Sequence, residues 1–183
     1  MQPYFLPYIG YFQLISSVDQ FVIYDNIKYT KKGWINRNRY LQNNKAEVFT
    51  LPLQKEPDSL DICRRHLSID FDKEKLIRKF EGAYYHAPYF KETIHFLRKI
   101  IRYEENNLFD FIHHSLVETC RYLGIASRII VSSNVDINHE LKAQERVLAM
   151  CTALGAKDYI NPVGGVDLYS REKFHEAGIQ LFF

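Results

Sequence analysis

The last third of the chain alternates short apolar runs with helical patterns, and no other feature constrains the fold as strongly. Apolar runs over 128–131, 158–160 and 179–182 predict strands, and the segments 140–154 and 170–177 between them predict helices. Strands separated by helices pair in parallel through right-handed crossover connections. The sequence therefore predicts an α/β fold with a mostly parallel, Rossmann-like sheet that is flanked by helices.

The first two thirds of the chain add elements of both kinds. A short helix is expected over 11–17 and a short buried strand over 21–24, followed by a β-rich segment over about 27–62. Apolar residues spaced three and four apart then predict a helical segment over about 73–124. A chain of 183 residues with 46% hydrophobic content suits one domain, so we expect 1–183 to form a single α/β domain.

Charge and cysteine content exclude several classes of protein. The 24 basic and 22 acidic residues leave a net charge of +2, so no general attraction to nucleic acid or membrane is expected. Three widely spaced cysteines without a CxxC pair argue against a disulfide framework and a zinc site. There is no apolar run of the roughly 18 residues that a membrane span needs and no export signal. We therefore expect a cytoplasmic protein without a metal site.

The opening stretch MQPYFLPYIGYFQLI combines rigid turn residues with a sudden helical start. Pro3 and Pro7 fix the backbone, and Gly10 allows another backbone or a ligand to come close. A loop that runs into a helix N-terminus can direct backbone N–H groups at an anion. The alternative is that the aromatic residues plug a core, and the residues alone favour neither reading. The candidate binding residues here are Gln2, Tyr4, Tyr8, Gly10 and Tyr11.

Loops that follow parallel strands are the second source of candidates, because ligands bind beyond the carboxyl ends of such strands. Ser132 follows the expected strand 128–131. Gly164 and Gly165 follow the expected strand 158–160 and could turn their amides toward a phosphate, with Tyr169 at the start of the next helix. Taken singly, the diglycine loop is better explained as a tight turn between a strand and a helix.

The segment KYTKKGWINRNR, residues 28–39, is the most polar and aromatic part of the chain. Trp34 could stack on a base or sugar, Arg37 could contact a phosphate, and Asn36 and Asn38 could bind hydroxyl groups. In a regular strand over 34–41, Trp34, Asn36 and Asn38 would share one face. A solvated basic strand is the alternative, and it explains the lysines better than these four residues.

Taken together, the opening motif QPYFLPYIGYFQLI, the motif KKGWINRNR and a closing pattern of single residues resemble the WbqC-like protein family. The closing pattern includes Arg146, Tyr159, Gly164, Gly165 and Tyr169. The resemblance extends over almost the whole chain. It implies a bacterial protein of O-antigen or other surface-polysaccharide biosynthesis, with a part in modifying amino sugars by acyl or aminoacyl groups.

Residues 8–15, YIGYFQLI, are also similar to the HxGHxxLI signature of the HUP class of nucleotidylyltransferases. The glycine and the apolar pair match, whereas Tyr8 and Tyr11 replace the two histidines. An uncharged phenol cannot stabilise charge on a transferring phosphate, so the similarity favours nucleotide binding over nucleotidyl transfer. A HUP fold also places a strand ahead of the signature. Here only Met1 and Gln2 precede Pro3, so that strand is very short or lies outside this sequence.

These features lead to the hypothesis of a transferase that acts on a nucleotide or nucleotide-linked sugar. Arg37 and the amides of Gly164 and Gly165 would contact phosphates, and Trp34 or Tyr4 would stack on the ligand. No catalytic base or cofactor is assigned. The alternatives are a non-catalytic nucleotide- or RNA-binding module and an interaction protein of a polysaccharide assembly complex, and a homodimer could also use the tyrosine-rich surface. The full set of candidate binding residues is Gln2, Tyr4, Tyr8, Gly10, Tyr11, Trp34, Asn36, Arg37, Asn38, Ser132, Arg146, Gly164, Gly165 and Tyr169.

Overall fold

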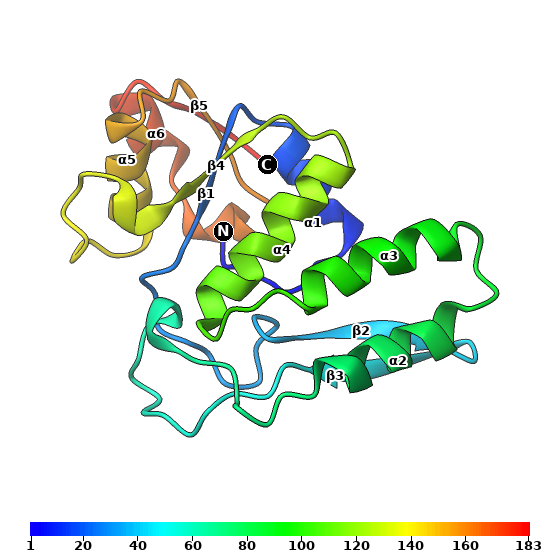
Figure 1. Cartoon of the computed structure of the whole chain (residues 1–183). Coiled ribbons are helices and arrows are strands. Elements are labelled where there is room, and N and C mark those ends of the chain that lie inside the picture. Colours follow the sequence, from blue (N-terminus) through cyan, green and yellow to red (C-terminus); the bar gives the residue numbers. More distant parts are fainter.

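Four short strands form two parallel pairs in the computed structural model, which describes all 183 residues (Figure 1). Strand β1 (Gln20–Ile23) pairs with β4 (Arg128–Val131), and β5 (Asp158–Ile160) pairs with β6 (Gln180–Phe182). The α/β class is therefore confirmed. The expected continuous Rossmann-like sheet is not present, because no strand connects β1 with β5 and the parallel strands remain two separate pairs.

Helices cover the parallel strands from both sides. Figure 1 shows α1 (Ile9–Ser16) and α4 (Leu108–Tyr122) to the right of the β1–β4 pair, and α5 (Ala143–Ala153) and α6 (Arg171–Glu176) to its left. Strands covered in this way read as nearly continuous apolar runs. This explains why β1 and β4 consist almost entirely of Phe, Val and Ile.

Glycine and asparagine set the ends of the longer helices. The Asn107 side chain caps α4 by accepting hydrogen bonds from the N–H groups of Phe109 and Asp110. After α4 and α5 the chain turns at Gly124 and Gly155, whose φ angles of 68° and 66° lie in the left-handed region that favours glycine.

An antiparallel hairpin forms the β-rich part of the chain. Strands β2 (Arg37–Gln42) and β3 (Lys45–Thr50) meet at Asn43 and Asn44, which both adopt positive φ angles. This is the conformation that a two-residue hairpin turn requires, and asparagine tolerates it. Helix α2 (Lys73–Tyr84) packs on the hairpin through Phe80, whose ring lies 5.8 Å from Tyr40 and 5.2 Å from Phe49.

The boundaries of this segment differ from the expectation in two places. Residues 34–36 lie outside the regular strand, which begins only at Arg37. Within residues 27–30, the β structure is limited to one isolated bridge between Lys28 and Asp61. A shared face for Trp34, Asn36 and Asn38 required strand alternation from Trp34 onward, and this condition is not met.

The main core lies where the opening turn, the hairpin and the long helices meet. It contains 24 buried residues, and helix α3 (Phe90–Ile101) closes it between α2 and α4. A separate cluster of five buried residues lies among α5, α6 and β6. The molecule therefore has two hydrophobic centres, one beside each pair of parallel strands.

The histidine pair on α4 gives a pH-dependence that can be tested. His113 stacks on Phe109 with ring centroids 5.7 Å apart, and burial lowers its pKa below the usual value. The folded state therefore resists protonation of His113, and this part of the stability is complete above the unfolded pKa of about 6.5 and is lost as the pH falls below it. We expect stability to fall between pH 7.5 and pH 5.5, and to fall less in His113→Phe. Urea unfolding of both proteins across this range measures the difference, and equal slopes would contradict the assignment.

Candidate functional site

Polar residues gather where β1 and β4 end. Asp25 and Asn26 follow β1, and Ser132 follows β4. The Ser132 hydroxyl lies 2.8 Å from Oδ1 of Asp25 and 2.6 Å from Oδ1 of Asn26, and the backbone N–H of Ser133 donates to Oδ1 of Asp25 at 3.0 Å. Asp25 and Ser132 are buried. They hold the two strand ends together and form the rigid floor of the site.

Arg146 reaches this floor from α5. Its guanidinium donates to the side-chain and backbone oxygens of Asn26 and lies 5.1 Å from the ring centroid of Tyr24. Its Nε atom is buried and has no hydrogen-bond partner. An arginine fixed in this way offers a cation at the carboxyl ends of parallel strands, where α/β proteins bind anionic ligands.

His139 completes the hydrogen bonds around Asn26. The Oδ1 atom of Asn26 accepts from Arg146, so its Nδ2 atom must donate to Nδ1 of His139, 3.1 Å away. Accepting at Nδ1 leaves the proton of the neutral ring on Nε2. The His139 ring therefore presents an N–H donor on its other side.

Tyr24 follows β1, Tyr159 belongs to β5, and both lie near a third tyrosine, Tyr169. Burial raises the pKa of Tyr24 to about 12. The Arg146 guanidinium acts to lower this pKa, and Tyr169 acts to raise it. Burial also raises the pKa of Tyr159 well above its usual value, with a further contribution from Tyr169, whose ring centroid lies 5.8 Å away. The Tyr159 hydroxyl donates to the Asn161 side chain at 3.2 Å. At neutral pH, Tyr24 and Tyr159 are therefore uncharged hydrogen-bonding groups.

The diglycine loop lies in a short 3₁₀ turn, residues Val163–Leu168, directly after β5. Gly165 is required for close packing, because a Cβ atom there would come within 1.9 Å of the Asn161 side chain. The Gly165 amide already donates to the carbonyl of Pro162 at 2.9 Å. Gly164, which is exposed, is therefore the better candidate of the two for contact with an anion.

The aromatic side chains of the opening stretch pack mainly in the hydrophobic core. Phe5 and Tyr11 are buried in the main core, and the Tyr11 hydroxyl donates to the carbonyl of Gln2 at 2.9 Å. Tyr4 packs against Tyr11, whereas Tyr8 is 68% exposed and covers Gly10, where a Cβ atom would clash with the tyrosine ring. The stretch begins beside the site, since the Tyr24 N–H donates to the carbonyl of Met1.

The tryptophan segment, residues 34–39, lies against the opening stretch. Trp34 is 39% exposed, and the guanidinium groups of Arg37 and Arg39 each lie 4.9 Å from its ring centroid. Asn36 is buried, accepts from the Tyr29 hydroxyl at 2.8 Å and donates to the carbonyl of Leu51 at 2.7 Å. The Asn38 side chain donates to the carbonyls of Phe5 and Leu6. Both asparagines thus use their side chains to hold the backbone.

The candidate residues fall into two groups. Ser132, Arg146 and Tyr169 surround the end of β1, and Gly164 and Gly165 follow the neighbouring β5. Gln2, Tyr4, Tyr8, Gly10 and Tyr11 of the opening stretch and the tryptophan segment form the second group. No hydrogen bond connects Trp34 or Arg37 with the diglycine loop.

Several residues of the site were not among the predicted binding residues. These are Tyr24, Asp25, Asn26, His139 and Asn161. The signal for four of them was their position directly after a strand, whereas His139 carried none.

Asn36→Ala tests the structural role of this asparagine. The change leaves the Tyr29 hydroxyl and the Leu51 carbonyl without their partner, and it should cost about 1–3 kcal/mol of unfolding free energy. Asn134→Ala, at an exposed position whose side chain makes no hydrogen bond, should change stability by less than about 0.5 kcal/mol. Denaturant unfolding of the two variants compares them. Equal stability would show that Asn36 is free for another role.

No group of three or more His, Cys, Asp or Glu side chains is arranged to hold a metal ion. None of the helices combines the length and the apolar character that are needed to cross a bilayer.

Comparison with known proteins connects the whole chain with one family. The model of the WbqC-like protein family matches residues 2–183. A relative from Mycobacterium tuberculosis (strain ATCC 25618 / H37Rv), described as "Uncharacterized protein Rv1507c", is 29% identical over 183 residues, which cover 99% of this chain and 78% of the relative. No solved structure matches the chain.

Proposed function

Since this chain belongs to the WbqC-like protein family, we propose that it is a bacterial enzyme of surface-polysaccharide biosynthesis that binds a nucleotide-linked amino sugar. The reaction would be the transfer of an acyl or aminoacyl group to that sugar. The nucleotide would bind at the carboxyl ends of β1, β4 and β5, in the place where α/β proteins commonly bind such ligands.

One observation carries the proposal: the fixed guanidinium of Arg146. Asn26 and Tyr24 orient it, and its buried Nε atom has no partner within the protein. A pyrophosphate suits a planar guanidinium, which can donate two parallel hydrogen bonds to phosphate oxygens. The exposed Gly164 lies just beyond β5 and could add a backbone donor.

The neighbouring side chains suit a neutral sugar better than a second anion. His139 presents an N–H donor, and Tyr24 and Tyr159 are uncharged phenols at neutral pH. Such groups orient hydroxyl and amide groups through hydrogen bonds. Orientation of this kind lowers the barrier to group transfer by fixing the reacting atoms before the reaction.

Calorimetry with a panel of uridine, guanosine and thymidine diphosphate sugars, amino sugars included, tests this function. We expect at least one of them to bind with a dissociation constant below about 0.1 mM, equivalent to about 5.5 kcal/mol. The affinity should change little between low and moderate salt, because a pocket for one pyrophosphate contacts few charges. The absence of binding at millimolar concentration to every member of the panel would refute the proposal.

A non-catalytic RNA- or nucleotide-binding module is the second candidate, and the tryptophan segment favours it. Exposed Trp34 lies 4.9 Å from the guanidinium groups of Arg37 and Arg39, which brings an aromatic ring and positive charge together, as the binding of a base beside a phosphate requires. In this case a single-stranded RNA should bind with a steep loss of affinity as salt increases, and Trp34→Ala should abolish most of the binding. If RNA does not bind, the module is excluded and the enzyme proposal is unaffected.

A further inference from the structure

The β2–β3 hairpin has one face in the core and the other in solvent. Its inner face carries Tyr40 and Phe49, which pack on Phe80 of α2. Side chains alternate along a strand, and residues that oppose each other in an antiparallel pair share a face. The exposed residues of the outer face are Arg39, Leu41, Ala46, Val48 and Thr50. We call these residues, together with Arg37 and Trp34, the outer hairpin face.

Part of the outer hairpin face is apolar. When one side of an antiparallel sheet is solvated, polar residues normally occupy that side. Here Leu41 and Val48 are 52% and 50% exposed. Leu41 opposes Ala46, and the neighbouring pair on the same face joins Val48 to Arg39. Leu41, Ala46 and Val48 therefore form one continuous apolar strip.

The charged groups of this face are all positive. The guanidinium groups of Arg37 and Arg39 lie 4.9 Å from the ring centroid of Trp34, and Arg37 donates to the carbonyl of the exposed Lys32. Glu47 is the one acidic residue of the two strands, and the alternation of side chains places it on the inner side. Positive charge is thus concentrated here, although the whole chain carries a net charge of only +2.

Trp34 lies beside this positive charge where β2 begins, and 39% of the residue is exposed. An indole ring combines an apolar body with a polar N–H group, and such rings are enriched at the boundary between lipid and water. In the loop after β3, Asp58 is already paired with Lys31 at 2.8 Å. The acidic group of that loop is therefore balanced by another cation.

We propose that the outer hairpin face binds the surface of a bilayer that contains negatively charged phospholipids. The apolar strip enters the boundary of the acyl chains, Trp34 lies at the level of the head groups, and the two arginines contact lipid phosphates. Attachment of this kind gains its affinity from buried apolar area and from attraction between opposite charges, and the outer hairpin face supplies both.

Other occupants fit this face less well. A second copy of the chain would bring the same positive charges and would be repelled. RNA, the ligand of the second candidate function, offers phosphates and bases but leaves the aliphatic strip uncovered. Two strands of six residues form a surface about 20 Å long and about 10 Å wide. Each partner of a stable protein complex buries roughly 800 Å², which is far more than this face provides.

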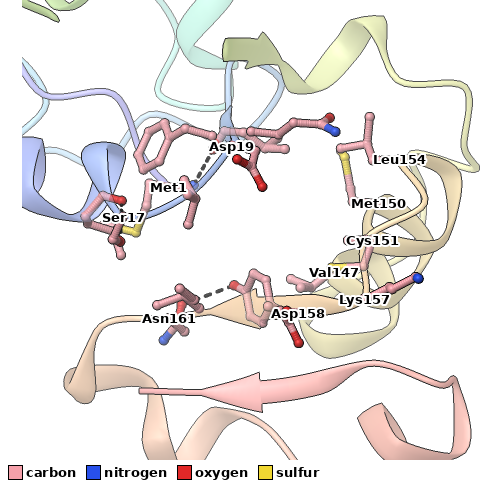
Figure 2. A pocket seen from close by; sticks show the side chains of 18 of the residues that line it. Met1, Ser17, Asp19, Val147, Met150, Cys151, Leu154, Lys157, Asp158 and Asn161 are labelled. Carbon is pink, nitrogen blue, oxygen red and sulfur yellow. Dashed lines mark hydrogen bonds between the residues drawn. The ribbon is translucent and has the colours of Figure 1, made fainter. Parts of the chain in front are cut away.

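Attachment to a bilayer through the hairpin leaves the candidate site free. Figure 1 shows the hairpin at the opposite end of the molecule from α5. The residues around β5 and α5 in Figure 2, among them Asp158 and Asn161, include none from the hairpin. The inference therefore does not depend on the proposed transferase activity, and either one can fail without the other.

Sedimentation of the full chain with lipid vesicles tests the proposal. The protein should sediment with vesicles of two parts phosphatidylcholine to one part phosphatidylglycerol, and it should stay in solution with phosphatidylcholine alone. Trp34 is the single tryptophan of the chain, so tryptophan fluorescence reports on this face alone. On the anionic vesicles its emission should shift to shorter wavelength, and brominated acyl chains should quench it.

Two variants separate the contributions of charge and apolar area. Arg39→Gln should weaken vesicle binding about fivefold, the effect of one basic residue at an anionic surface, and the loss should shrink as salt increases. Leu41→Thr combined with Val48→Thr should weaken binding about tenfold at every salt concentration, because threonine suits a strand but removes apolar surface. The matched controls are Arg128→Gln and Ile69→Thr, which change exposed residues outside the hairpin and should leave binding unchanged.

Several results would overturn the proposal. One is the absence of sedimentation with anionic vesicles at low salt. Another is sedimentation without a change in Trp34 emission, because a different surface would then hold the lipid. A response of Trp34 to single-stranded RNA but not to vesicles would overturn it in favour of the RNA-binding module. Equal losses in Arg39→Gln and Arg128→Gln would also overturn it, because the attraction would then come from general charge.

Discussion

Replacing Phe5 with alanine should remove about 3–5 kcal/mol from the free energy of unfolding, the largest loss expected for a residue of the opening stretch. Phe5 is completely buried, and its ring lies 5.4 Å from Phe111 of α4 and 6.2 Å from Phe49 of β3. Its N–H donates to the carbonyl of Ile35 at 3.0 Å. The residue thus joins the opening turn, the hairpin and a long helix, and a cavity at this position cannot close without moving all three.

Tyr8→Ala is the matched control for this change. Tyr8 belongs to the same stretch, is also aromatic and is 68% exposed, so its removal should alter stability by less than about 0.5 kcal/mol. Urea unfolding of both variants measures the difference. A loss below about 1 kcal/mol for Phe5→Ala would mean that the opening stretch is not part of the core.

Arg146→Ala should weaken the binding of a nucleotide sugar by about 10- to 100-fold, which corresponds to about 1.4–2.7 kcal/mol. The variant removes the one guanidinium fixed at the ends of the parallel strands. Arg146→Lys should recover part of the affinity, because an ammonium keeps the charge but cannot donate two parallel hydrogen bonds. Calorimetry with the tightest ligand of the panel gives the three dissociation constants.

Arg128→Ala is the control for the loss of a positive charge. Arg128 is exposed, begins β4 at the opposite end of the strand, and its side chain makes no hydrogen bond or ion pair. Its removal changes the net charge by the same amount and should leave the affinity unchanged. If the two alanine variants weakened binding equally, the effect would come from general charge and not from a site.

The sequence predicted those parts of the fold that depend on local pattern. The strands expected at 128–131 and 158–160 agree with β4 and β5, and the strand expected at 179–182 differs from β6 by one residue. Short apolar runs between amphipathic helices carry this information within a few residues. The division of the sheet into two pairs could not be predicted in this way, because it depends on which strand edges meet in space.

The candidate site was predictable only in part, for a similar reason. Ser132 was identified because it follows a strand, and Arg146 was identified through family resemblance. The bonds that connect them run through Asn26, which is 106 residues from Ser132 and 120 from Arg146, and no sequence spacing indicates such contacts. Asn36 has the polarity of a ligand-binding residue, and its structural role becomes visible only through its bonds to Tyr29 and Leu51.

Mapping of backbone amide chemical shifts by NMR during titration with a nucleotide sugar tests the central claim most directly. That claim is that the ligand binds at the carboxyl ends of the parallel strands. The account predicts that the largest shifts occur at Asn26, Ser133, Asn161 and Gly164, which follow the carboxyl ends of β1, β4 and β5. Shifts confined to residues 34–39, or saturation without any shift near Arg146, would contradict it.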